Sequence, residues 1–253
     1  MSRAVAIGID VGSTTCKGVV IDDAGEVVAR HVEPTHPRIE EQSTRLVAKL
    51  RAEVGDDALP VGSTGYGRKR VVGARALTEI TCHARGAFSR VKHAFVLVDM
   101  GGQDTKVIQI GAGGDVADFA MNDKCAAGTG RFLEVILGRL HVPFEEVVAL
   151  VAGTTRSVPV SSTCTVFAES EVISLVAQGE PVEGIVRGLH QSLATRVAAL
   201  AGRQLDGADV FMSGGVALNG AMVDALALAL KRQVRVLPEP QLVGAIGAAL
   251  SVR

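Results

Sequence analysis

The chain has 253 residues, of which 47% are hydrophobic, enough to bury the core of one large domain or two small ones. A formal net charge of −1 at pH 7 argues against nucleic acid and anionic membranes as partners. The sequence shows neither an apolar stretch of signal-peptide length at its start nor about 18 consecutive apolar residues, so we expect a cytoplasmic protein.

The first 30 residues have the pattern of three strands joined by turns. Residues 4–30 read AVAIGIDVGSTTCKGVVIDDAGEVVAR, in which a Gly-Ser-Thr turn and the turn at AGE separate three apolar segments. This pattern predicts a β-meander. A similar unit follows at residues 93–122, HAFVLVDMGGQDTKVIQIGAGGDVADFAMN, with Asp99 in the place of Asp10 and Gly101 in that of Gly12. The chain therefore contains an internal duplication.

Helical periodicity accounts for most of the remaining chain. Apolar residues recur at helical spacing in the segments 40–53, 74–91, 126–138, 143–152, 165–178, 182–203, 217–231 and 241–252. Strands at 209–213 and 233–237 alternate with these helices. The pattern predicts an α/β protein of two related lobes, residues 1–93 and 94–253, and the C-terminal helix, residues 241–253, can pack back onto the first lobe.

Two glycine-containing turns follow strands that end in aspartate, DVGSTTCK at residues 10–17 and DMGGQDTK at residues 99–106. The backbone N–H groups of such a turn can surround an anion, and Lys17 adds a positive charge. Two turns of this kind could hold the phosphates of one nucleotide, with the aspartates holding Mg²⁺ through water. A third turn, MSGGVALNG at residues 212–220, could let the backbone approach an adenine or ribose closely. Small residues also start the last helix, in PEPQLVGAIGAAL at residues 238–250.

Each turn alone also suits a tight hairpin or a strand–helix corner. Together, and in this order, the three turns resemble those of the superfamily of sugar kinases, heat-shock protein 70 and actin. The resemblance covers essentially the whole chain and implies two actin-like, ribonuclease H-like lobes with ATP or ADP between them. It implies that Asp10 and Asp104 position Mg²⁺ and water, with Gln103 beside them in the catalytic set. The implied nucleotide ligands are Gly12, Ser13, Thr14, Thr15, Lys17, Asp99, Gly101, Gly102, Gly214, Gly215, Ala217 and Gln241.

The four cysteines are widely spaced and form no CxxC pair. A lone cysteine is usually a small buried apolar residue, which is our prediction for Cys16 and Cys82. His83 is predicted to be a packed or hydrogen-bonded residue of its helix. Cys125 and Cys164 stand directly before predicted helices, where the dipole and free N–H groups stabilise a thiolate. Two cysteines cannot close a four-thiolate site, but two copies of the chain can do so around a two-fold axis.

The segments around these two cysteines carry a closer resemblance. NDKCAAGTGRFLEV at residues 122–135 and SSTCTVFAESEVIS at residues 161–174, together with GIDVGSTTCK, STGYGR, DMGGQDTK and MSGGV, look like the activators of 2-hydroxyacyl-CoA dehydratases. These belong to the BadF/BadG/BcrA/BcrD ATPase family, with the related ATPase subunits of benzoyl-CoA reductase. The resemblance implies a homodimer with one [4Fe–4S] cluster held by Cys125 and Cys164 of both chains. A reduced ferredoxin or flavodoxin would load the cluster, and ATP hydrolysis would drive the electron to an iron–sulfur dehydratase or aryl-CoA reductase component.

Three alternatives remain open at this point. A small-molecule kinase of the same superfamily would need a substrate pocket with a base and would leave Cys125 and Cys164 unexplained. An actin-like assembly protein would form polymers with ATP. A permanent subunit of a benzoyl-CoA-type reductase would co-purify with its partner.

Overall fold

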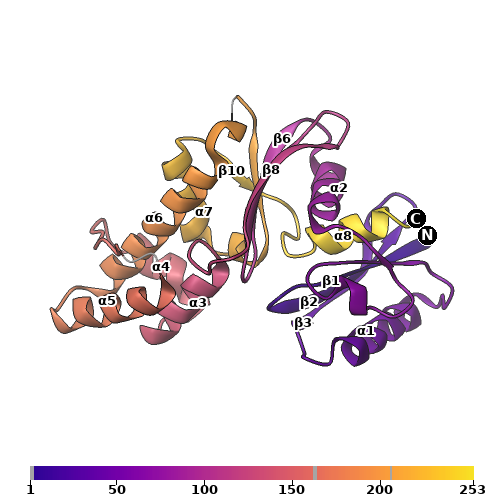
Figure 1. Ribbon diagram of the computed structural model, residues 1–253, viewed down its shortest axis with the longest axis horizontal. Coiled ribbons are helices and arrows are strands. Elements are labelled where there is room, and N and C mark those ends of the chain that lie inside the picture. Colours follow the sequence, from indigo (N-terminus) through magenta and orange to yellow (C-terminus); the bar gives the residue numbers. More distant parts are fainter. Residues whose placement is uncertain (1–2, 162–163, 206) are drawn as a thin grey trace. The chain divides into compact units, whose positions relative to one another are not determined.

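The computed structural model describes residues 3–161, 164–205 and 207–253 (Figure 1). By its contacts, the chain forms two compact units: Met1–Leu97 with Ile108–Asp118 and Leu237–Arg253, and Val98–Val107 with Phe119–Val236. The sequence predicts two lobes with a boundary near residues 92–95. This boundary stays a prediction, because the compact units are defined by packing and each of them combines segments that are separate in the chain. No helix in the described ranges is both long and apolar enough to cross a bilayer.

The first sheet is built on the predicted meander. Its strands are β1 (Ala4–Val11), β2 (Thr15–Asp22), β3 (Val27–Pro34), β4 (Val61–Thr64) and β5 (Arg75–Ala76), in the order β3-β2-β1-β4-β5. β1 pairs antiparallel with β2, and β2 pairs antiparallel with β3, so the meander is confirmed. β4 and β5, which the periodicity did not predict, extend the sheet on the other side of β1 in parallel.

Helices cover both faces of this sheet because the side chains of β1 alternate between them. Ile7 and Ile9 pack with the buried leucines of α1 (Ile39–Val54), whereas Ala6 packs with α8 (Val243–Leu250). α2 (Glu79–Val91) packs against α8 (Figure 1). Any side chain at Gly8 would begin 1.9 Å from the Ala245 carbonyl oxygen, so only glycine allows α8 to lie this close to β1.

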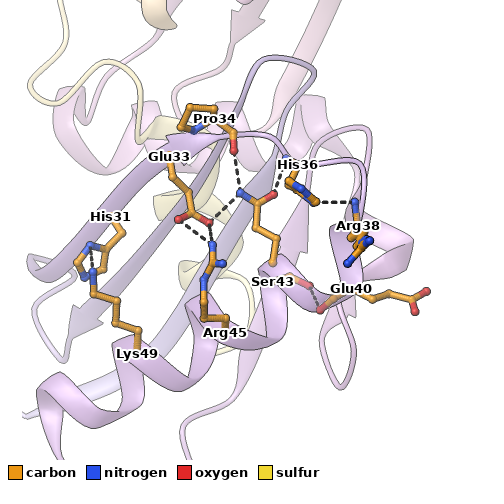
Figure 2. Close-up of polar contacts among 10 residues, drawn as sticks. His31, Glu33, Pro34, His36, Arg38, Glu40, Ser43, Arg45 and Lys49 are labelled. Atoms are coloured by element: carbon orange, nitrogen blue, oxygen red, sulfur yellow. Dashed lines mark hydrogen bonds and ion pairs between the residues drawn. The ribbon is translucent and has the colours of Figure 1, made fainter.

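Polar contacts fix α1 to β3 at the edge of this sheet (Figure 2). Glu33 of β3 accepts hydrogen bonds from Gln42 Nε2 at 2.7 Å and from Arg45 Nη2 at 2.9 Å. One helical turn further on, Lys49 Nζ lies 3.2 Å from His31 Nδ1. The edge strand therefore carries charged side chains that the helix engages, which protects the edge from pairing with another chain.

The second sheet repeats the order of the first. Its strands are β6 (Phe95–Met100), β7 (Thr105–Ile110), β8 (Val116–Asn122), β9 (Val210–Ser213) and β10 (Val234–Val236), in the order β10-β9-β6-β7-β8. In each sheet the first strand of the meander pairs on its other side with a strand that comes later in the chain. This shared topology matches the duplication seen in the sequence.

In the described part of the chain, five more helices lie between β8 and β10. They are α3 (Gly130–Arg139), α4 (Val147–Ala152), α5 (Thr165–Ala177), α6 (Val182–Ala201) and α7 (Gly220–Leu230), with 3₁₀ turns at Arg68–Arg70, Phe144–Glu146, Gly202–Leu205 and Gly215–Leu218. α6 packs against α3, α4, α5 and α7. Five predicted helices begin later than expected: 74–91 begins at Glu79, 126–138 at Gly130, 143–152 at Val147, 241–252 at Val243, and 217–231 at Gly220. In the last case Asn219 caps the helix by accepting from Met222 N, which periodicity alone does not show.

His190 is a buried imidazole in the middle of α6. Its Nδ1 lies 2.7 Å from the Val186 carbonyl oxygen, so Nδ1 carries the proton, and Asn219 Nδ2 donates to Nε2 at 2.9 Å. Burial lowers the pKa of His190 below its ordinary value of 6.5. The folded protein therefore holds the neutral imidazole, and protonation favours the unfolded chain.

We expect this histidine to make folding pH-dependent on the acid side. Because the folded pKa lies below the unfolded one, stability is complete above about pH 6.5 and falls as the pH drops below it, by up to about 1.4 kcal/mol between pH 7.5 and 5.5. His190→Gln cannot titrate and should lack this component. The measurement is the free energy of unfolding against pH for both proteins. Parallel curves would contradict the assignment.

Candidate functional site

The first turn brings a buried carboxylate and an amine together at the end of β1. Asp10 and Lys17 are paired across β1 and β2, and Lys17 Nζ lies 3.1 Å from Asp10 Oδ2. Asp10 is 4% exposed. Lys17, predicted as a phosphate ligand, thus neutralises the aspartate in this structure.

The turn between these strands is closed and anchored by hydrogen bonds. Gly12 N donates to Thr15 O at 3.1 Å, and Thr35, just after β3, donates from its hydroxyl to Gly12 O at 2.8 Å and from its backbone to Thr14 O at 2.9 Å. With its carbonyl groups engaged in this way, the turn has a defined backbone conformation, which an anion-binding turn requires.

Two buried side-chain oxygen atoms lie beside this turn. Asp10 Oδ1 and Thr14 Oγ1 have no hydrogen-bond partner among the residues that the structure describes. Buried polar atoms in native proteins nearly always have partners, including water and ligands. A carboxylate oxygen and a hydroxyl suit hydrated Mg²⁺ and phosphate, so the residues present fit these groups.

The second turn repeats the pairing with one more carboxylate. Lys106 Nζ lies 3.4 Å from Asp99 Oδ2 and 2.7 Å from Asp104 Oδ2, and Ser213 Oγ donates to Asp99 Oδ1 at 2.7 Å. Lys106, Asp99 and Asp104 are all at most 5% exposed. The structure therefore joins β6, β7 and β9 through one buried polar cluster.

Lys106 and Ser213 are residues of this cluster that were not predicted from the sequence. The signal for Lys106 was present, because aligning DVGSTTCK with DMGGQDTK places Lys106 opposite Lys17. In both turns the lysine follows its aspartate by seven positions and forms an ion pair with it.

The second turn also contacts the start of α3. Gly130 N donates to Gly101 O at 2.9 Å, and Arg131 N donates to Gly102 O at 2.7 Å. The first N–H groups of a helix have no hydrogen-bond partner within the helix. Here two carbonyl groups of the turn accept hydrogen bonds from them. A displacement of the turn would therefore be passed directly to α3.

The segment before α3, which carries Cys125, is held to the same sheet. Thr105 Oγ1 donates to Gly128 O at 2.6 Å. Asn122 Nδ2 donates to Cys125 O at 3.0 Å and to Ala127 O at 2.7 Å. These contacts place the cysteine on a short loop between β8 and α3.

The third turn, residues 212–220, requires glycine at position 214. Gly214 has φ +88°, and any side chain there would begin 2.2 Å from the Met100 carbonyl oxygen. Gly215 and Ala217 lie in the 3₁₀ turn that follows. Gln241 belongs to the other compact unit, so its place with these residues stays a prediction.

The predicted site residues fall into two groups. The first unit holds Asp10, Gly12, Ser13, Thr14, Thr15, Lys17 and Gln241, and the second holds Asp99, Gly101, Gly102, Gln103, Asp104, Gly214, Gly215 and Ala217. Within the second group, Gln103 is exposed on its turn. All of these roles remain predictions.

The cysteines divide as expected into two buried and two accessible thiols. Burial, with the charge of Asp10 second, raises the pKa of Cys16 to about 12, and burial raises the pKa of Cys82 to about 11. Cys125 is exposed and Cys164 is partly exposed, and all four are free. Cys16 and Cys82 are confirmed as buried residues and are poor candidates for thiolate ligands.

The prediction that both accessible cysteines stand at helix starts is correct only for Cys164. Cys164 is the N-cap residue of α5, and its carbonyl oxygen accepts from Ala168 N at 2.8 Å. Cys125 lies ahead of α3, whose N-cap is Thr129. A turn in which Thr129 N and Oγ1 both donate to Ala126 O separates the cysteine from the helix.

The BadF/BadG/BcrA/BcrD ATPase family matches residues 7–252. The chain belongs to this family. It is 43% identical over 250 residues to the activator of lactoyl-CoA dehydratase of Anaerotignum propionicum, covering 96% of this chain and 95% of that protein. The predicted family and the predicted ATPase class are confirmed.

Solved structures confirm the predicted fold class. The activator of the 2-hydroxyisocaproyl-CoA dehydratase from Clostridium difficile, solved with bound ADPNP, has a TM-score of 0.89 and 39% identity, with 98% of this chain and 93% of that chain covered. A ROK family glucokinase from Streptomyces griseus has a TM-score of 0.66 at 18% identity, covering 98% and 99%, which shows the shared fold alone. The chain is an α/β protein of the actin-like ATPase and sugar kinase fold.

The accessible thiols of Cys125 and Cys164 are soft ligands of the kind that iron and zinc bind. Within the described ranges, no group of three or more histidine, cysteine, aspartate or glutamate side chains is close enough to hold a metal ion. A single chain therefore offers no complete site among these residues. Two accessible soft ligands on each chain fit a cluster shared by two copies.

Proposed function

We propose that this protein is an ATP-dependent activator of a 2-hydroxyacyl-CoA dehydratase, which passes one electron from ferredoxin or flavodoxin through a [4Fe–4S] cluster shared by two chains. The observation that carries this proposal is the position of the accessible thiols. Cys125 and Cys164 are the cysteines that reach the surface, in a chain 43% identical along 96% of its length to a dehydratase activator.

The two aspartate turns would hold the nucleotide. Asp10 Oδ1 and Thr14 Oγ1, both buried without a protein partner among the described residues, would bind hydrated Mg²⁺ and a phosphate oxygen. Asp104, which is paired with Lys106, would act at the second turn beside Gln103. Bound Mg²⁺ would supply neutralisation of the charge that develops on the phosphates.

Cys125 and Cys164 would hold the cluster, which supplies one-electron chemistry when bound. A homodimer is supported by the surface beside Cys164. Val166 and Phe167 follow it on α5 and are 68% and 69% exposed. Large apolar side chains at such exposure, next to a ligand that needs a second chain, favour burial by another copy.

The hydrogen bonds of the second turn support coupling between ATP and the cluster. Gly101 and Gly102 accept from the first N–H groups of α3, and Thr105 holds the loop of Cys125 through Gly128 O. A phosphate bound at this turn would act on the backbone that carries a cluster ligand. The proposal therefore includes a cluster whose surroundings depend on the nucleotide.

The test is ATP-dependent electron delivery by anaerobically purified protein. With a reduced ferredoxin and a 2-hydroxyacyl-CoA dehydratase, the protein should activate the dehydratase only when MgATP is present. Asp10→Asn should lower ATP hydrolysis roughly 100-fold or more, because it removes the charge that positions the metal. It should leave the cluster absorbance unchanged, because the cluster ligands lie elsewhere in the chain.

The matched control is Asp22→Asn. Asp22 is a buried aspartate of the same sheet, at the opposite end of β2, where it accepts from the turn N–H groups of Ala24 and Glu26. This variant should keep ATP turnover. Activation of the dehydratase without ATP, or iron-free protein after reconstitution, would exclude the proposed function.

A further inference from the structure

Arg196 of α6 lies beside the loop that carries Cys125. A hollow of about 320 Å³ lies within the second compact unit. Its walls include Arg196 together with residues that flank Cys125 in the sequence, namely Asn122, Ala127 and Gly128. Among the described residues that line the hollow, Arg196 has the only charged side chain. The fold thus brings a cation from α6 to the loop between β8 and α3, although the two segments are far apart in the sequence.

Two contacts fix the guanidinium group of Arg196. Its Nη2 donates to Ser192 Oγ, one helical turn earlier, at 3.2 Å. Its Cζ lies 5.3 Å from the centroid of the Phe132 ring, which is a cation–π contact with a fully buried side chain of α3. An arginine that stacks on a buried ring and donates a hydrogen bond has a defined orientation. The positive charge is therefore held between α6 and α3.

The charge of Arg196 acts on Cys125. Burial lowers the pKa of Arg196, and the negative charge of a Cys125 thiolate opposes this change. Arginine keeps its proton in proteins, so the attraction is between a permanent cation and the thiolate. Salt screens a partly buried charge less than an exposed one. Asp123 and Lys124, the exposed neighbours of Cys125, have opposite charges whose effects on the loop largely cancel.

A cation at this place would act on an iron–sulfur cluster bound through Cys125. When bound, the proposed [4Fe–4S] cluster supplies one-electron chemistry, and its reduction potential depends on its net charge and on the groups around it. The reduced cluster is more negative than the oxidised one, so a fixed positive charge stabilises the reduced form more. In a two-fold dimer, each chain would contribute one such guanidinium to the shared cluster.

We propose that Arg196 tunes the reduction potential of the cluster: its guanidinium, fixed beside Cys125, favours the form that carries the electron received from ferredoxin or flavodoxin. This role rests on the proposed function and adds to it a residue of α6 that is not a cluster ligand. Because Arg196 acts through its charge, removing that charge should change the potential while the iron stays bound.

Two variants of Arg196 separate its charge from its packing. Arg196→Met keeps an apolar stem without the charge, and Arg196→Lys keeps the charge. We expect Arg196→Met to lower the equilibrium constant for cluster reduction about 10-fold, which corresponds to a midpoint potential about 59 mV more negative for one electron. Arg196→Lys should stay within about 3-fold of the unsubstituted protein, because an ammonium replaces the guanidinium as the cation. The measurement is an anaerobic redox titration of the reconstituted protein, followed by the electron paramagnetic resonance signal of the reduced cluster, together with its iron content.

Arg187→Met is the matched control, since it removes another arginine of α6, which donates to Thr154 O at 3.1 Å. It should leave the potential unchanged. A wild-type potential in iron-loaded Arg196→Met would overturn the role of Arg196, and so would an equal shift in Arg196→Lys or in Arg187→Met. If Arg196→Met does not fold or bind iron, the same titration of Arg196→Gln, whose amide is uncharged but polar, decides in its place. Unsubstituted protein that binds no iron after reconstitution would instead refute the proposed function itself.

Discussion

Replacing Cys164 by serine should abolish the proposed [4Fe–4S] cluster, and Cys125→Ser should do the same. The reason is the ligand count, because each change leaves two thiolates where a [4Fe–4S] cluster needs four. Serine keeps the size of the side chain but replaces the soft sulfur ligand by oxygen. The measurement is the iron content and visible absorbance of anaerobically reconstituted protein. The unsubstituted dimer should hold about four irons.

The buried cysteines provide the control for this experiment. Cys16→Ala and Cys82→Ala should keep the cluster, since burial raises the pKa of these thiols to about 12 and about 11 and removes them from the surface. An unaltered cluster spectrum in Cys164→Ser would show that the shared cluster is not held as proposed.

Replacing Lys106 by methionine should destabilise the protein by about 3–5 kcal/mol, the usual cost of removing one partner from a buried ion pair. The change leaves Asp99 and Asp104, 2% and 5% exposed, without the cation that lies between them. Methionine fills a similar volume, so the loss reflects charge rather than a cavity. Urea unfolding followed by circular dichroism is the suitable measurement, because the chain has no tryptophan.

Two further variants separate charge from packing in this cluster. Lys17→Met removes the equivalent lysine of the first turn, which pairs with Asp10. Its side chain is 14% exposed, against 1% for Lys106, so the loss should be smaller. Asp104→Asn added to Lys106→Met should restore part of the lost stability by removing one of the two buried charges. Equal losses for the two lysine variants would contradict the burial argument.

Elements with strong local signals were predictable from the sequence. Both meanders were predicted from apolar strand segments and from the turn residues that separate them. The helices α1, α5 and α6 were predicted from apolar residues at helical spacing. β4 was not predictable, because Val61–Thr64 has four residues and little apolar character, and it forms by pairing with β1. The start of α3 was predicted at residue 126, but the helix begins at Gly130. Its first N–H groups donate to Gly101 and Gly102, which are distant in sequence, so the local pattern does not show this start.

The sequence by itself determined the duplicated aspartate turns, the accessible cysteines and membership of the ATPase family, because each depends on residues close together in the chain. Only the tertiary structure decided which side chains meet. It paired Lys106 with two aspartates, bonded Ser213 to Asp99, and brought Arg196 to the loop that carries Cys125. These contacts arise where helices and strands distant in sequence pack together, as α8 does on β1 at Gly8, and no local pattern of residues encodes such an approach.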